Sequence, residues 1–179
     1  MNKLAPILAA ALLLTALQVR AQSTPAAAAA GPAVYMAAGA ATRPVADAYF
    51  AAYFARDWAR LEPLLADDVS LNDPTATLLF GAGGGAIGKT QVMTGLRTVF
   101  AGVKAFDFRQ QRALYSGNFA IYEGDLDMTI DMRDGRDVSS TTPMVVVLEV
   151  KDGKIFSHRD YVDYAPFVLA ERANRPPRK

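Results

Sequence analysis

The chain has 179 residues, no cysteine, one histidine, and 19 basic against 18 acidic side chains. This near balance of charge gives no support for a nucleic-acid partner, and the absence of cysteine excludes disulfides, thiol nucleophiles and cysteine-based metal sites. A single histidine also argues against a polyhistidine zinc site and a Ser-His-Asp triad. We therefore expect no metal and no cofactor.

Residues 1–21 are predicted to be a secretory signal peptide. A short basic start is followed by an apolar run over residues 4–17, and Val19-Arg20-Ala21 has small or aliphatic side chains where signal peptidase cuts. The alternative is a membrane anchor, but the run is shorter than the roughly 20 residues that cross a bilayer. We expect cleavage after Ala21, a periplasmic or secreted protein, and no membrane contact after cleavage. The mature chain keeps 17 basic and 18 acidic side chains, a net charge of −1.

The rest of the chain divides into three parts by composition. Residues 22–41 are uncharged and rich in alanine, proline and glycine, which predicts a linker. Residues 42–170 hold the periodic segments and are predicted to form one domain. Residues 171–179 are basic and interrupted by two prolines, which indicates a flexible tail.

The first half of the domain reads as helices around one short strand. A helix is expected from Thr42, with Tyr49 and Tyr53 on its apolar face. Asp57 is expected to cap a second, short helix. Residues 69–73 read as a strand that ends in a turn at proline.

A glycine-rich loop over residues 81–88 and a third helix over about 90–101 come next. The hydrophobic period then changes to two, and turns are expected at 134–135 and 152–153. The last strand is expected from residue 155 to about 164. Helices first and antiparallel strands afterwards predict an α+β protein.

Residues 83–90 match the phosphate-binding pattern G-x-x-x-x-G-K-[ST]. That motif belongs to domains of parallel strands joined by crossover helices, and no segment after residue 101 is predicted to be helical. We therefore expect no nucleotide. An acidic ladder, Glu123, Asp125, Asp127 and Asp131, could hold calcium, but it alternates with apolar residues and reads as the solvent face of a strand.

The order of helix, helix, strand, helix and antiparallel strands, over about residues 43–168, resembles the nuclear transport factor 2-like superfamily. That group includes SnoaL-like polyketide cyclases, ketosteroid isomerases and limonene-epoxide hydrolases. The resemblance implies a cone-shaped, strongly curved antiparallel sheet, packed with about three N-terminal helices around an apolar pocket. It also implies a small apolar ligand and a homodimer through the sheet.

The resemblance to the isomerases places a catalytic tyrosine at Tyr49 and a proton-shuttling aspartate at Asp73. The second oxyanion donor of those enzymes falls on Val146, which cannot donate a hydrogen bond. The resemblance to the epoxide hydrolases instead places a catalytic base at Asp160 and a water-holding asparagine at Asn72.

Neighbouring strand residues point to opposite faces, so Asn72 and Asp73 cannot both enter the pocket. Asp73 shares its face with two apolar residues, which favours it as the general base with Tyr49 as hydrogen-bond donor. The expected ligand contacts are Tyr53, Asn72, Leu126, Met128, Val146 and His158. We expect an isomerase- or cyclase-like proton-transfer enzyme. The alternatives are a non-catalytic ligand-binding or protein-interaction module, and an epoxide hydrolase-like enzyme.

The export signal predicts the N-terminus of the mature protein. Protein recovered from a Gram-negative host should begin near Gln22, as N-terminal sequencing or intact mass will show. An N-terminus at Met1 in the membrane fraction would contradict the predicted localisation.

Overall fold

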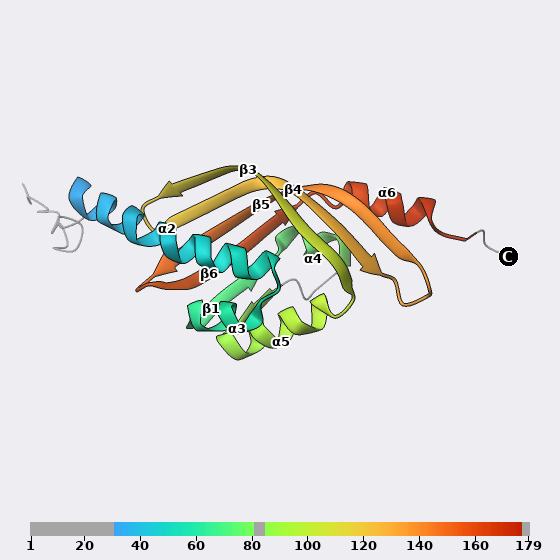
Figure 1. The fold of residues 1–179 in the computed structure, drawn as a ribbon, viewed down its shortest axis with the longest axis horizontal. Coiled ribbons are helices and arrows are strands. Elements are labelled where there is room, and N and C mark those ends of the chain that lie inside the picture. Colours follow the sequence, from blue (N-terminus) through green and yellow to red (C-terminus); the bar gives the residue numbers. More distant parts are fainter. Residues whose placement is uncertain (1–30, 81–84, 177–179) are drawn as a thin grey trace, which may run out of the picture.

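The computed structural model describes residues 31–80 and 85–176, so the predicted signal peptide lies outside the described residues. Six strands form one sheet in the order β2-β1-β6-β5-β4-β3, and the sheet curves over helices on one side (Figure 1). This confirms the α+β class and the cone-like curvature. The strands are β1 (Leu65–Asn72), β2 (Gly85–Ile87), β3 (Val103–Ser116), β4 (Phe119–Asp131), β5 (Asp137–Lys151) and β6 (Lys154–Val162).

The sheet is mixed, whereas the resemblance implied an antiparallel one. Strands β1 and β6 pair in parallel, and every other neighbouring pair is antiparallel. The last strand of the chain thus enters the sheet beside the first, so β6 sits between β1 and β5. This long-range pairing brings residues near 70 next to residues near 158.

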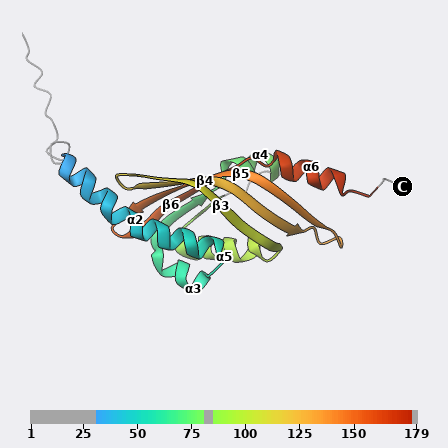
Figure 2. The same ribbon diagram turned by 45° about the horizontal axis from the view of Figure 1, so that its top comes forward.

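Helices α2, α3 and α5 lie together on the same side of the curved sheet, while α6 runs out toward the C-terminus (Figures 1 and 2). None of the helices in the described ranges is long and apolar enough to span a membrane. The helical segments are α2 (Pro32–Phe54), α3 (Trp58–Leu61), the 3-10 helix η1 (Glu62–Leu64), α4 (Pro74–Phe80), α5 (Lys89–Phe100) and α6 (Ala165–Ala173).

Helix α2 begins at Pro32, not at Thr42, so the linker prediction is wrong for residues 32–41. Proline is tolerated in the first turn, and the alanines after it are the strongest helix formers. The hydroxyl groups of Tyr35 and Ser116 lie 2.7 Å apart, which ties the early part of α2 to β3. Thr42, the expected cap, is buried inside the helix.

Two helices were not predicted from the sequence. Helix α4 follows β1 directly, where the sequence indicated only a turn. Helix α6 takes up residues 165–173, so β6 ends at Val162 and part of the predicted tail is helical. It packs beside β5 beyond Met144, where pairing with β6 has ended, and it buries Phe167. Tertiary contact supplies the stability that these short segments lack on their own.

The predicted capping of the second helix is confirmed. Asp57 accepts a hydrogen bond from the backbone N–H of Arg60 at 3.1 Å. The α-helix ends at Leu61 and continues as the 3-10 helix that contains Pro63, whose ring nitrogen has no hydrogen to donate.

Gly124 allows the sheet to bend sharply over the helices. A Cβ atom at this position would lie 2.3 Å from the carbonyl oxygen of Arg109 and 2.8 Å from the ring of Phe108. The register between β3 and β4 also shifts here, between Gln110 and Arg112. Bulges and glycines of this kind increase local twist and bend a strand. Phe108 can therefore pack against Phe50 of α2, with ring centroids 5.2 Å apart.

The residues around Lys89 do not form a phosphate-binding loop of the usual kind. Strand β2 precedes it and pairs antiparallel with β1, while residues 81–84 lie outside the described ranges. The ammonium of Lys89 lies 2.7 Å from the carboxylate of Asp67, which is almost fully exposed. The lysine therefore has an ordinary surface partner.

We expect Lys89→Ala to leave the melting temperature essentially unchanged, because exposed ion pairs contribute little to stability. ATP with magnesium should not raise the melting temperature of either protein, as differential scanning fluorimetry will show. A rise in the wild type that is lost in Lys89→Ala would instead establish a nucleotide site.

Candidate functional site

A cavity of about 650 Å³ lies between the inner face of the sheet and helix α5. Its wall is mostly apolar, with contributions from the inward residues of β4 and from α5, α6 and the ends of β1 and β6. Side chains along the wall include Leu71, Leu96, Phe100, Phe106, Leu126, Met128, Ile130, Met144, Val162 and Phe167. A cavity of this size and character suits a small apolar molecule.

Strand β6 and helix α2 bring a buried polar chain to the inner end of this cavity. His158 and Asp160 are two residues apart, so both point inward. The Nε2 atom of His158 lies 2.7 Å from Oδ1 of Asp160, and its Nδ1 atom lies 2.8 Å from the hydroxyl of Tyr49. Tyr53 donates to Oδ2 of Asp160 at 3.1 Å. We call these four residues the buried chain.

The tyrosines set the direction of the hydrogen bonds in the buried chain. Burial, and then the charge of Asp160, raise the pKa of Tyr49 and of Tyr53 well above the ordinary value, so both phenols keep their protons. The Tyr49 hydroxyl can then donate to Nδ1 of His158, which leaves the imidazole proton on Nε2, directed at Asp160. The Asp160 carboxylate thus accepts two hydrogen bonds at the cavity wall.

Asp73 lines the same cavity but is held by different contacts. Its Oδ1 atom accepts from the hydroxyl of Thr75 at 2.6 Å and from the backbone N–H of Ala76 at 2.8 Å. The second of these is a typical helix N-cap contact, and it begins α4. Tyr164 donates to the Oδ2 atom at 2.7 Å. Burial, followed by this hydrogen bond, raises the pKa of Tyr164.

The structure places the predicted site residues in three environments. Five line the cavity: Tyr53, Asp73, Leu126, Met128 and Asp160. Tyr49, Val146 and His158 are fully buried and lie outside the cavity lining. Asn72 is exposed at the end of β1, where it pairs with Gly85 of β2. Tyr49 donates to His158 and not to Asp73, so the expected pair of Tyr49 and Asp73 is not brought together.

Sequence reasoning missed several residues of the cavity. Tyr164 was read as the end of a strand, and Phe167 was not assigned to a helix. Arg133, which precedes the predicted turn at 134–135, was not singled out from the sequence, yet it lines the cavity. Of the cavity wall, only the apolar residues of β4 could be recognised from the sequence, because they alternate with polar ones. This alternation correctly placed Leu126 and Met128 on the inner face of the sheet.

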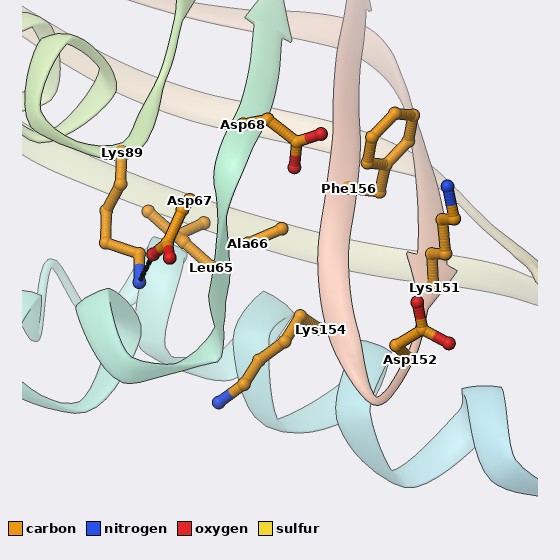
Figure 3. A pocket seen from close by; sticks show the side chains of 9 residues that line it. All are labelled: Leu65, Ala66, Asp67, Asp68, Lys89, Lys151, Asp152, Lys154 and Phe156. Atoms are coloured by element: carbon orange, nitrogen blue, oxygen red, sulfur yellow. Dashed lines mark ion pairs between the residues drawn. The ribbon is translucent and has the colours of Figure 1, made fainter.

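A second, smaller hollow of about 290 Å³ lies beside the start of β1 (Figure 3). Its three lysines already have partners: Lys89 pairs with Asp67, Lys154 donates to the carbonyl of Pro63 at 2.6 Å, and Lys151 lies over the ring of Phe156. With its cations engaged, this hollow has no built binding site.

The acidic ladder pairs with strand β3. Arg112 contacts Glu123, and Arg109 lies near both Asp125 and Asp127. Within residues 31–80 and 85–176, no group of three or more His, Asp or Glu side chains is placed to hold a metal ion. Three of the four acids thus form cross-strand ion pairs, whereas Asp131 accepts the backbone N–H of Arg133 and lines the cavity.

Solved structures share this fold at low sequence identity. A protein named as a SnoaL-like polyketide cyclase from Shewanella denitrificans matches 74% of this chain and 98% of its own, with 19% identity and a TM-score of 0.66. A protein from Catenulispora acidiphila with a ketosteroid isomerase-like fold was solved in complex with trimethylamine. It matches 74% of this chain and 97% of its own, with 19% identity and a TM-score of 0.59. An LEH-like epoxide hydrolase from M. tuberculosis matches 73% of this chain and 87% of its own, with 22% identity and a TM-score of 0.55.

These identities are too low to carry an activity, so the structural matches show the fold alone. A search of curated proteins finds no match. The model of the SnoaL-like domain family, in contrast, matches residues 46–158, which span α2 to the middle of β6 and include most of the cavity wall. The chain therefore belongs to the SnoaL-like domain family.

Proposed function

We propose that this protein binds a small apolar molecule and transfers a proton on it, with Asp160 as the general base. The observation that carries the proposal is the position of Asp160. Its carboxylate lies at the wall of the apolar cavity, only 5% exposed, and is held by His158 on one oxygen and Tyr53 on the other.

The surroundings of Asp160 suit a base. The carboxylate faces an apolar cavity, and a carboxylate held in a fixed position beside a substrate can act as a general base. The two hydrogen bonds fix its orientation, and each oxygen keeps a further lone pair for a substrate proton. Tyr49 acts through His158, so Tyr49 and His158 are positioning residues.

The chemistry follows from one base at the wall of a mostly apolar cavity. Asp160 removes a proton from the substrate, which leaves an anion, and then returns the proton to another atom of the same molecule. The product is an isomer of the substrate. In a flexible substrate that also carries a carbonyl group, the carbanion can instead attack the carbonyl carbon, and Asp160 returns the proton to the alkoxide that forms as the ring closes. The cyclase and isomerase-fold neighbours share the fold that forms this cavity.

Asp73 is a weaker candidate for the base because its contacts have a structural purpose. Oδ1 accepts two hydrogen bonds at the start of α4, and Oδ2 accepts one from Tyr164. Thr75 in turn accepts the backbone N–H of Val162 at 2.9 Å, which links α4 to the end of β6. Removing a proton from a substrate would compete with these contacts.

Two further expectations are part of the proposal. We place the mature protein outside the cytoplasm, because of the predicted signal peptide. We also propose a homodimer through the outer face of the sheet, where Leu114 of β3 and Tyr161 of β6 are 52% and 39% exposed. The solution mass of the mature protein tests the dimer.

Asp160→Asn tests the base directly. A suitable probe is 5-nitrobenzisoxazole, an apolar molecule whose C3 proton is removed by a base as its N–O bond breaks, giving a coloured phenolate. Wild-type protein should turn over the probe with saturation, and Asp160→Asn should reduce turnover by about a hundredfold or more. Asparagine keeps the shape and can still accept from His158, so the fold should be retained.

Asp73→Asn is the matched control, since it removes the other carboxylate of the same cavity. It should keep turnover within about threefold of the wild type, because it leaves the general base in place. Loss of turnover in Asp73→Asn and not in Asp160→Asn would transfer the chemistry to Asp73. Binding without turnover in the wild type would favour the non-catalytic alternative.

The capping contacts of Asp73 predict a distinct effect on stability. Asp73→Ala should lower the free energy of unfolding by about 1–2 kcal/mol, because α4 loses its N-cap. Asp73→Asn should lower it much less, since its amide oxygen can still accept from the Ala76 N–H. Urea unfolding followed by circular dichroism will compare the two. Equal losses in both variants would show that the charge of Asp73, rather than the cap, is what stabilises the fold.

A further inference from the structure

The cavity has a second polar end, formed by Asp131 and Arg133 at the hairpin between β4 and β5. Resting on the proposed function, we propose that the substrate is an elongated amphiphile whose anionic group binds Arg133 while its reacting end lies beside Asp160. The proposed ligand is therefore an acid with a long apolar carbon chain.

The length of the cavity follows from the strand register. Asp160 of β6 pairs with Val146 of β5, which pairs with Tyr122 of β4. The hairpin end of β4 is Asp131, so the two ends are separated by the strand from residue 122 to 131. That is roughly 30 Å along the strand, and less in a straight line because the sheet curves. A single cavity that touches both ends must be elongated.

The wall between the two ends suits a flexible chain. Leu126, Met128 and Ile130 follow one another at every second position of β4, so they form a continuous apolar strip. Met132 and Met144 also line the cavity and, like Met128, have unbranched side chains. Methionine adapts its shape easily and is common where a surface must accept flexible ligands.

Among residues 31–80 and 85–176, no side chain forms an ion pair with the guanidinium of Arg133, whereas the charged residues near it are paired. Arg136 pairs with Asp134 at 2.7 Å, and Lys104 pairs with Asp137 at 2.6 Å. In the described part of the chain, Arg133 makes only one recorded hydrogen bond, from its backbone N–H to Asp131. Its φ of 61° is also rare for a residue other than glycine, as often found at functional sites.

The two ends of the cavity differ in charge, because the inner end holds two carboxylates and the outer end holds one arginine beside one carboxylate, and this difference orients an amphiphile. The inner end holds the carboxylates of Asp73 and Asp160, which repel an anionic group. Arg133, at the solvent end, offers a planar donor that fits a carboxylate. Asp131 opposes it in part, but its Oδ1 atom is turned toward the backbone of Arg133. The acid group therefore stays at the hairpin and the chain points inward.

A charge series of one chain length tests this orientation. Decanoate, 1-decanol and decylammonium can be titrated into the mature protein, with the fluorescence of Trp58 as the signal. Trp58 is the single tryptophan, and its ring lies 5.3 Å from that of Phe100 in the cavity wall. Decanoate should bind about fivefold more tightly than decanol, the scale of a solvent-exposed ion pair. Decylammonium should bind more weakly than decanol.

Arg133→Gln should reduce the decanoate affinity to that of decanol and leave decanol unchanged, whereas Arg133→Glu should make decylammonium the preferred probe. Arg60→Gln, an exposed arginine on α3, is the matched control and should keep the wild-type order. Equal affinity for all three probes in the wild type, or a decanoate preference that survives in Arg133→Gln, overturns the inference and leaves the proposed function standing. No binding of any probe would instead contradict the proposed function itself.

Discussion

The hydrogen-bonded chain from Tyr49 through His158 and Asp160 to Tyr53 is the constraint on which the rest of the site depends. All four side chains are buried, and a buried polar group without a partner is costly. Since α2 supplies both tyrosines and β6 supplies the other two residues, satisfying the chain fixes the rotation of the helix against the sheet. The same contact directs Asp160 to the cavity wall, so the feature that stabilises the fold also positions the proposed base.

Curvature then determines the space that remains between helix and sheet. The bend near Gly124 brings the ring of Phe108 against Phe50 of α2. The cavity lies farther along β4, where Leu126, Met128 and Ile130 face it. Helices α5 and α6 also border the cavity, and Phe100 of α5 and Phe167 of α6 form part of its wall. On the sheet, its apolar wall follows from the alternation along β4.

The two carboxylates of the cavity illustrate how the same side chain acquires different uses. Asp160 is held by side chains alone, and its bonds leave the carboxylate directed at the cavity. Asp73 is bound to the backbone at the start of α4 and to Tyr164 beyond the end of β6. Because α4 and α6 lie on either side of this contact, Asp73 connects two segments that are distant in sequence.

Patterns of local origin were readable from the sequence alone. The cap at Asp57 and the period of two in β4 rest on spacing within short segments, and both are confirmed. The α+β class and the resemblance to the SnoaL-like group rest on the order of such segments along the chain, and they are confirmed too. Tertiary contacts decided the remainder: the start of α2 at Pro32, helices α4 and α6, and the parallel pairing of β1 with β6. The partner of Tyr49 belongs to this second group, because side chains that are far apart in sequence meet only after the sheet has curved and each buried polar group has found its hydrogen bond.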